Sequence, residues 1–217
     1  SRQIINIPGV TLMTRVCGFT ASYYLGLEAN DSLRVFCETH AELEFSIDCY
    51  AYGAASGGHL AYAEELRTQH GANVDWISEG AAYGGHQDYA EKLRTQHSAD
   101  VNKIAMGAAR GGDKAYAELL RTQRGADVDS IAEGAAEGGQ TDYAEQLRVQ
   151  HGANINYIAE ATARGGHRAY TEKLRMHHGI HRFHRADVNW IASGAASGGH
   201  RTYAEVLRTQ HGADVNW

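Results

Sequence analysis

Histidine is the residue of this sequence whose recurrence comes closest to a chemical pattern. One column of histidines follows a Gly-Gly pair, and a second column stands eleven residues further along the chain. Imidazole nitrogens can ligate a metal or move a proton. Because Asp113 and Gln140 replace histidine in the first column and Arg124 replaces it in the second, we interpret both columns as structural. The first would bond backbone groups at a turn, and the second would face the negative end of a helix. The columns are His59, His86, His167 and His200, and His70, His97, His151, His178 and His211.

A six-residue insertion, Ile180 to Arg185, adds two further histidines in a regular spacing with His178. His178, His181 and His184 could ligate zinc, although the segment offers no Cys or carboxylate ligand. We interpret the insertion as a protruding loop, either simply tolerated or contacting a partner through Phe183.

Cys37 and His40 could pair as nucleophile and base, but no third group that would orient the histidine is identifiable. A buried thiol is the simpler interpretation. The sequence also lacks the GxxxxGK loop that cradles phosphates. The polar columns repeat, whereas an active site needs a unique constellation. We therefore expect no enzyme activity and no cofactor.

Glutamate and arginine recur as pairs three residues apart, a spacing that places both side chains on one helix face. Such pairs could link neighbouring repeats, or the arginines could form a basic stripe for nucleic acid. The matched glutamates and the net charge of −6 argue against the second alternative. The pairs are Glu64/Arg67, Glu91/Arg94, Glu118/Arg121, Glu145/Arg148, Glu172/Arg175 and Glu205/Arg208.

All of these residues belong to a repeat with a period of 27 residues. Gly-Gly pairs and columns of Tyr and Leu keep the same period, and the insertion lengthens one interval to 33 residues, before Ile191. The isoleucines at the regular interval are Ile77, Ile104, Ile131 and Ile158.

Each unit predicts two short helices. The first, helix A, would begin at an Asn or Asp N-cap and end at the Gly-Gly pair, where glycine adopts the left-handed conformation without strain. The second, helix B, would end at a single Gly, in a column that Ser98 interrupts. The middle of helix A holds Gly or, once, Ala161, which indicates close approach to neighbouring helices. The expected N-caps are Asp75, Asn102, Asp129, Asn156 and Asn189.

One stretch carries a family resemblance. The segment AASGGH at 195–200, followed by Leu207 and by GADVN at 212–216, resembles the ankyrin repeat. The resemblance covers residues 53–217 and, more weakly, 29–52. It implies an all-α, right-handed αα-hairpin solenoid that binds other proteins. The units are about six residues shorter than usual and lack the T-P-L-H motif, so the β-hairpin finger should be absent.

The remaining expectations concern organisation and location. We divide the chain into an N-terminal segment and cap over residues 1–28, a degenerate repeat over 29–52, and six units over 53–217. Gln3 to Met13 could form a short extended segment. The chain starts without Met and stops within a repeat, so we expect a fragment of a longer protein.

Cys17, Cys37 and Cys49 form no CxxC pair, and this odd count predicts reduced thiols and a cytoplasmic protein. No apolar run is long enough for a membrane span.

Comparison of the units separates framework columns from columns that vary. In helix A the first, fourth and eighth positions vary, and their spacing places them on one helix face. Exposed aromatic, Met and Arg side chains are typical of binding hot spots. We therefore predict that this face, concave by the ankyrin resemblance, binds another protein. A variable face on helix B would be the convex, solvated side. The predicted partner-binding residues are Trp76, Glu79, Tyr83, Lys103, Met106, Arg110, Tyr157, Glu160, Arg164 and Trp190, with Phe183 in the insertion.

Three alternatives remain open for this face and this chain. The variable face could be merely solvated. The chain could be a helical repeat that binds nucleic acid, or a targeting or regulatory domain of a larger enzyme.

Overall fold

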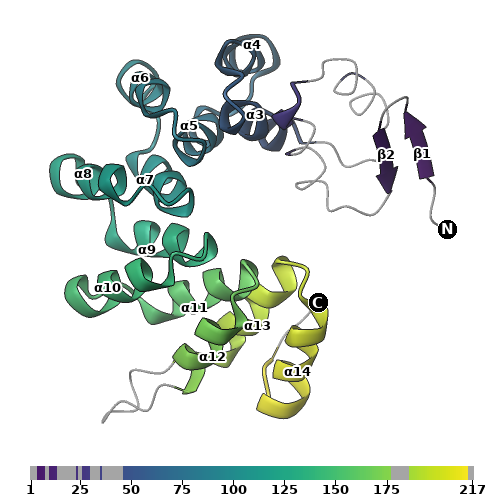
Figure 1. Ribbon diagram of the computed structural model, residues 1–217, viewed down its shortest axis with the longest axis vertical. Helices are drawn as coiled ribbons and strands as arrows, with labels where there is room; N and C mark the ends of the chain where they lie inside the picture. Colours follow the sequence, from purple (N-terminus) through teal and green to yellow (C-terminus); the bar gives the residue numbers. More distant parts are fainter. Residues whose placement is uncertain are drawn as a thin grey trace. The chain divides into compact units, whose positions relative to one another are not determined.

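The computed structural model describes residues 4–7, 10–13, 23, 26–29, 35, 46–176 and 186–214 (Figure 1). The chain divides into two compact units, residues 1–99 and 100–217. The first unit contains the strands β1 (Ile4–Ile7) and β2 (Val10–Met13) and the helices α3 (Ile47–Ser56), α4 (Leu60–His70), α5 (Val74–Tyr83) and α6 (Gln87–His97). The second contains α7 (Val101–Arg110), α8 (Lys114–Arg124), α9 (Val128–Glu137), α10 (Thr141–His151), α11 (Ile155–Arg164), α12 (Arg168–Met176), α13 (Val188–Ser197) and α14 (Arg201–His211).

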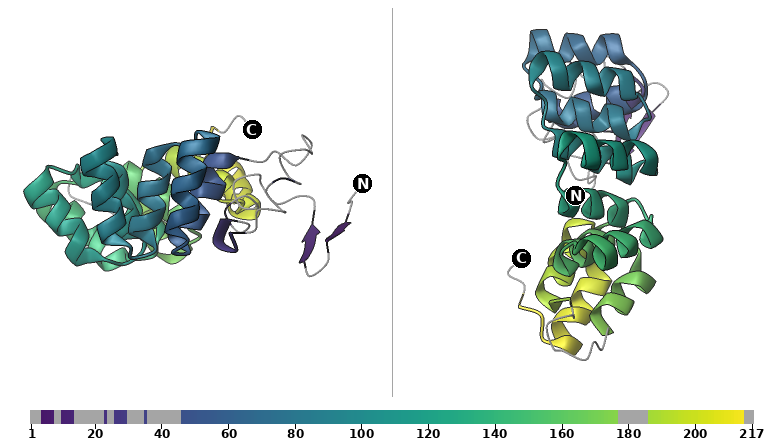
Figure 2. Two further views of the ribbon diagram at one scale, coloured as in Figure 1. Left: turned by 90° about the horizontal axis from the view of Figure 1, so that it is seen from above. Right: turned by 90° about the vertical axis from the view of Figure 1, so that its left-hand side faces the viewer.

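The helices form consecutive antiparallel hairpins, which confirms the predicted all-α hairpin solenoid. Within each unit the odd-numbered helices are helix A of successive repeats and the even-numbered helices are helix B (Figure 1). Figure 2 shows the same helices from two further sides. A ten-residue helix, a three-residue turn, an eleven-residue helix and a three-residue link account for the 27-residue period. The links of the described repeats, such as Gly125–Asp127, leave no room for a β-hairpin finger.

The N-terminal strands confirm the extended segment expected between Gln3 and Met13. They pair antiparallel, with Ile4 opposite Met13 and Ile7 opposite Val10. Most of the expected degenerate repeat, 30–34 and 36–45, lies outside the described residues. The boundary expected between residues 52 and 53 falls inside α3, because this helix A already begins at Ile47.

Helix A begins at an Asn or Asp side chain, but two residues earlier than the sequence predicted. In α11, for example, Asn154 is the N-cap, and its Oδ1 accepts a hydrogen bond of 2.9 Å from the Asn156 N–H. The prediction that Asn156 is the cap was wrong, because the Val or Ile before it already has helical geometry. The observed caps of the complete repeats are Asn73, Asp100, Asp127, Asn154 and Asp187.

Within each unit, the column that was mistaken for the caps instead links a repeat to the next. Its side-chain oxygens accept hydrogen bonds of 2.7–2.8 Å from the backbone N–H of the following repeat's N-cap. One polar column therefore starts the helix and the other fixes the register between repeats. The linked pairs are Asp48 with Asn73, Asn102 with Asp127, Asp129 with Asn154, and Asn156 with Asp187.

The Gly-Gly pair ends helix A, but its two glycines serve different purposes. At the end of α9, Gly139 has φ +80 and takes the left-handed conformation of a Schellman turn, in which Gln140 N–H donates to Ala135 O at 2.8 Å. Gly138 has an ordinary helical φ of −75. A Cβ there would overlap the carbonyl oxygen of Arg110, so this position requires small size rather than a special turn.

The small residue in the middle of helix A has the same cause. A Cβ at Gly134 would overlap the backbone carbonyl of Met106 in α7, and one at Gly194 would overlap that of Glu160 in α11. Together with the first glycine of each pair, these positions form a G-x-x-x-G strip, along which the backbones of adjacent A helices touch. The sequence prediction of close approach at this column is therefore confirmed.

The core consists of the Ile and Ala columns of helix A and the Leu, Tyr and Ala columns of helix B. One repeat replaces two of the alanines by threonines. Thr162 and Thr171 are fully buried, and their hydroxyls form a 3.0 Å hydrogen bond to each other. The paired replacement leaves both hydroxyls bonded, since Thr162 also donates to Ala159 O. The largest fully buried residues of the repeats are Leu66, Ile77, Leu93, Ile104, Leu120, Ile131, Leu147, Ile158, Leu174, Ile191 and Leu207.

We expect Gly134→Leu to destabilise the fold by more than the ~1–3 kcal/mol of ordinary overpacking, because the Cβ itself collides with immobile backbone. Urea denaturation would measure the change in the free energy of unfolding. Ala115→Leu, on the exposed side of α8, is the control and should change little. An unchanged midpoint for the Gly134 variant would show that helices α7 and α9 do not touch there.

We expect Ser98→Gly to stabilise the chain by about 0.5–1 kcal/mol. Ser98 ends α6 with φ +57, a left-handed conformation that costs an L-residue strain and glycine none. The reciprocal change, Gly125→Ser, with φ +74 in the equivalent position, should destabilise by a similar amount. Thermal melting of both variants checks this, and a loss of stability in Ser98→Gly would contradict it.

Candidate interaction surface

The predicted partner-binding residues stand on one face of the A helices, but they differ in accessibility. Because helix A begins two residues earlier than predicted, its predicted first, fourth and eighth positions are its third, sixth and tenth residues. The side chains at the predicted first position of α11 and α13, Tyr157 and Trp190, are 38% and 39% exposed. Trp76 and Lys103, at the same position of α5 and α7, are half-buried. The face is thus most open in the last two A helices.

The fourth position of helix A contradicts the sequence prediction in two repeats. Glu79 and Met106 were expected to face a partner, yet they are only 4% and 8% exposed. For Met106 the reason is the close approach just described: its backbone lies against Gly134, so the neighbouring helix also flanks its side chain. Glu160, at the same position of α11, is half-buried.

In the first unit the aromatic residues of this face pack against one another. The rings of Trp76 and Tyr83 lie 6.3 and 6.2 Å from the ring of Tyr52, which is 3% exposed. Tyr52 was missed because its repeat was taken as degenerate, although it stands in the same column as Glu79. Trp76 and Tyr83 therefore have a packing role that their sequence positions did not reveal.

In the second unit charged residues cross this face from helix to helix. Arg110 Nη2 lies 2.8 Å from Glu137 Oε2, and Arg164 Nη1 lies 3.0 Å from the same oxygen. Arg164 Nη2 also lies 3.1 Å from Glu133 Oε1. Two predicted binding residues, Arg110 and Arg164, thus already hold internal ion pairs. The alternation of Arg, Glu and Arg at 27-residue intervals in the eighth column could have predicted this.

The exposed aromatic pair lies next to this charged group. The rings of Tyr157 and Trp190 meet edge to face, with centroids 5.4 Å apart and planes at 75°. One turn further along the same two helices, Ser193 Oγ lies 3.4 Å from Glu160 Oε1. The structure thus brings three predicted residues together: Tyr157, Glu160 and Trp190.

The histidines after the Gly-Gly pairs are structural in the repeats where their bonds are described. The Nε2 atoms of His167 and His200 bond the carbonyls of Glu137 and Arg164, the last residues of the preceding A helices, at 2.9 and 3.2 Å. His59 Nε2 bonds the Leu27 carbonyl at 2.9 Å. Asp113, which replaces histidine, instead caps α8 by accepting from the Tyr116 N–H. Among the described residues, no group of three or more His, Cys, Asp or Glu side chains is placed to hold a metal ion.

Several candidate residues fall outside the described part of the chain. These are the insertion Ile180 to Arg185 with Phe183, the histidines His178, His181 and His184, and Cys17, Cys37 and His40. Of the cysteines, Cys49 is described, and it is buried.

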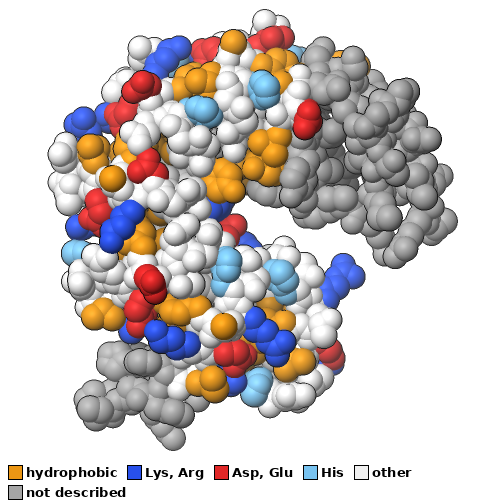
Figure 3. Space-filling model, in the orientation of Figure 1, with side chains coloured by type: hydrophobic (Ala, Val, Ile, Leu, Met, Phe, Trp, Pro, Cys, Tyr) orange, Lys and Arg blue, Asp and Glu red, His pale blue; other side chains and the backbone are white. Residues whose placement is uncertain are grey.

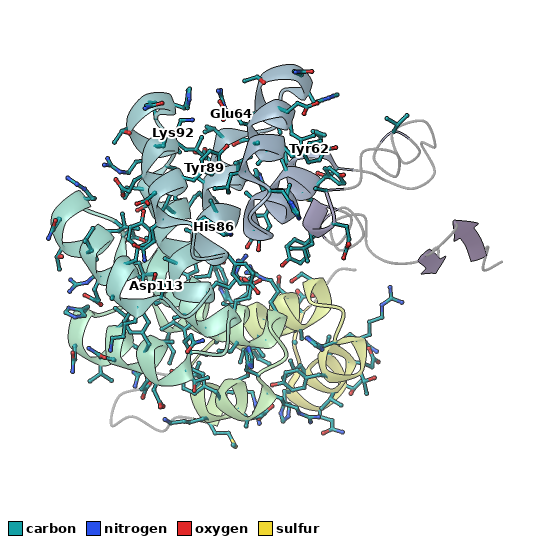
Figure 4. All side chains as sticks on the ribbon, turned by 45° about the horizontal axis from the view of Figure 1, so that its top comes forward. Tyr62, Glu64, His86, Tyr89, Lys92 and Asp113 are labelled. Atoms are coloured by element: carbon teal, nitrogen blue, oxygen red, sulfur yellow. The ribbon has the colours of Figure 1, made fainter. Side chains whose placement is uncertain are left out.

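The Glu–Arg pairs form as predicted, and a tyrosine extends them between repeats. Glu64 accepts hydrogen bonds from Arg67 of its own helix and, at 3.1 Å, from the Tyr89 hydroxyl of the next B helix. Lys92 lies 5.8 Å from the centre of the Tyr89 ring. Figure 4 labels Glu64 on α4 and Tyr89 and Lys92 on α6. We call this arrangement the Tyr–Glu–Arg ladder. The same hydrogen bond from a tyrosine hydroxyl to a glutamate carboxylate recurs in three further pairs: Tyr143 with Glu118, Tyr170 with Glu145 and Tyr203 with Glu172.

The ladder shifts the acidity of its members. Hydrogen bonds from Arg67 and then Tyr89 outweigh burial and lower the pKa of Glu64 to about 2. Arg148 and Tyr170 likewise lower the pKa of Glu145 to about 2. Burial, together with the neighbouring carboxylate, raises the pKa of each ladder tyrosine. Folding therefore favours charged glutamates and neutral tyrosines.

Charges of both signs are interspersed over the visible face of the chain, and no basic stripe stands out (Figure 3). The outer side of helix B is exposed, as expected, at Ala61, Gln87, Lys92 and Ala115. No helix in the described ranges is both long and apolar enough to cross a bilayer.

No known protein family and no curated protein matches this chain.

We expect the free energy of unfolding to be greatest between about pH 5 and 10. The ladder glutamates have lowered folded-state pKa values, so their contribution is complete above the unfolded value and is lost as pH falls towards about 2. The tyrosines have raised values, so their contribution is lost as pH rises above about 10.

Tyr170→Phe tests this ladder. The variant should lose about 0.5–1.5 kcal/mol at neutral pH and show a shallower loss of stability in acid, because Glu145 loses a hydrogen bond. Tyr157→Phe, a tyrosine outside the ladder, is the control. Urea midpoints measured across pH would check both variants. If the midpoint of Tyr170→Phe fell in acid as steeply as that of the parent chain, Tyr170 would not lower the pKa of Glu145.

Proposed function

We propose that this chain is a protein-binding scaffold of ankyrin-like character, which binds a partner through the helix-A face of its second unit. The observation that carries the proposal is the exposed edge-to-face pair of Tyr157 and Trp190. Aromatic residues are enriched where proteins bind one another, because they bury a large area and lose few rotamers.

Packing within the stack gives no reason for aromatic rings at these positions. The equivalent residues of α7 and α9 are Lys103 and Ser130, and the same helix-to-helix contacts form there through glycine. The Ile column is the same from α5 to α13, whereas the position of Tyr157 and Trp190 holds Trp, Lys, Ser and Tyr in these helices. Variation at an exposed position of a constant framework is what a solenoid uses to select a partner.

Nucleic-acid binding is the weaker alternative. The arginines of the ladder are paired with glutamates, and the arginines of the helix-A face are paired with Glu133 and Glu137. A backbone-phosphate binder would need an excess of unpaired cations. A regulatory role within a larger enzyme would be compatible with the same binding face, and it would be exercised through protein contact.

The odd number of cysteines, with no CxxC pair among them, supports a cytoplasmic location as part of this proposal.

Capture of a partner by the full chain, compared with the double variant Tyr157→Ala/Trp190→Ala, tests the proposal. We expect the double variant to fold, because the two rings are partly exposed, and to lose at least about tenfold in affinity for the partner. The matched control is Leu119→Ala/Val149→Ala, which removes exposed apolar side chains from the B helices and should bind normally.

Equal loss of affinity in both double variants would reject the helix-A face. Capture of nucleic acid instead, with an affinity that collapses as salt is raised, would support the alternative.

A further inference from the structure

Two contacts join α11 and α13 on the helix-A face, one between aromatic rings and one between polar side chains. We call them the first and second rung. The first rung is the Tyr157–Trp190 ring pair, and the second, one turn along both helices, is the contact between Glu160 and Ser193. An aromatic surface with a carboxylate beside it is the arrangement that attracts an organic cation, since ring faces carry negative electrostatic potential.

The carboxylates of α9 and α11 on this face are not equally close to the arginines that cross it. Glu133, Glu137 and Glu160 share the guanidinium groups of Arg110 and Arg164. Arg164 approaches Glu133 and Glu137 to 3.1 and 3.0 Å, but Glu160 only to 4.0 Å. Glu160 is thus the carboxylate with the weakest ion pair, and it is the one beside the exposed rings.

The acidity of Glu160 agrees with this geometry. Burial raises its pKa above the ordinary value, the Arg164 charge only partly offsets this, and the Glu133 carboxylate raises it further. An added cation would stabilise the charged form. Its side chain remains 21% exposed, so a ligand can reach it.

We propose that the partner presents a lysine or arginine side chain, which lies against Tyr157 and Trp190 and places its charge on Glu160. Ser193 Oγ would remain beside the carboxylate as a further polar contact. The inference rests on the proposed function, and it specifies the partner segment as basic. Charge complementarity supports this choice, because the chain as a whole carries a net charge of −6.

Titration of the full chain with a peptide of alternating lysine and alanine, followed by NMR at the Trp190 indole N–H, tests the inference. We expect saturable shifts with this peptide and none with the matching glutamine–alanine peptide. Glu160→Gln should weaken binding at least about fivefold, the effect of one charged contact. The control Glu65→Gln makes the same change of charge on the exposed side of α4 and should alter affinity less than about twofold.

Ser193→Lys is a second variant that does not depend on removing a packed side chain. Ser193 is exposed, and a lysine there would place a cation of the chain itself on Glu160, so the peptide should bind more weakly. Unchanged peptide affinity in this variant would overturn the inference.

Two further outcomes separate the inference from the proposed function. If Glu160→Gln and Glu65→Gln lower the affinity for the peptide equally, the attraction comes from the net charge of the chain and Glu160 does not bind the cation. If the lysine peptide fails to shift Trp190 while Tyr157→Ala/Trp190→Ala still abolishes partner binding, the scaffold function stands and the basic-segment assignment is wrong.

Discussion

Backbone contact between successive A helices is the constraint on which the rest of each unit depends. Gly134 and Gly138 let α9 touch the carbonyls of Met106 and Arg110, and Gly194 and Gly198 do the same for α13 against Glu160 and Arg164. A side chain larger than glycine at these positions must separate the helices. The spacing between repeats is therefore set by glycine on the A side rather than by the size of core side chains.

This fixed spacing makes the polar links between repeats possible. Asn156 reaches the Asp187 N–H, His200 reaches the Arg164 carbonyl, and Tyr203 reaches Glu172, all in adjacent repeats. Each link is short and modest in energy, about 0.5–1.5 kcal/mol for a typical hydrogen bond. Because the links to the N-cap and the tyrosine links recur at every described junction within a unit, a change in helix spacing would weaken many of them together. The same spacing brings Tyr157 of α11 within ring contact of Trp190 of α13.

The sequence allowed the fold to be predicted because each repeat restates the same rules. Period, hairpin form, helix ends and the small column all follow from residues such as Ile131, Gly134 and Gly139. The N-cap was misplaced because two polar columns, at Asn154 and Asn156, fit a cap equally well until the helix start is known.

The binding face was predicted in part. Helix periodicity gives the direction of a side chain but not how near the next helix lies, so Glu79 and Met106 appeared open although they are buried. The ion pairs of Arg110 and Arg164 depend on side-chain conformations across two helices, which a repeat pattern does not specify.

We propose that the glycine-spaced framework presents Tyr157 of α11 and Trp190 of α13 to a partner protein. Hydrogen–deuterium exchange of the full chain, with and without its captured partner, tests this proposal. We expect binding to protect amides in residues 155–164 and 188–197 and to leave those in 141–151 and 201–211 unchanged. Protection confined to the two B helices, with α11 and α13 unaffected, would contradict it.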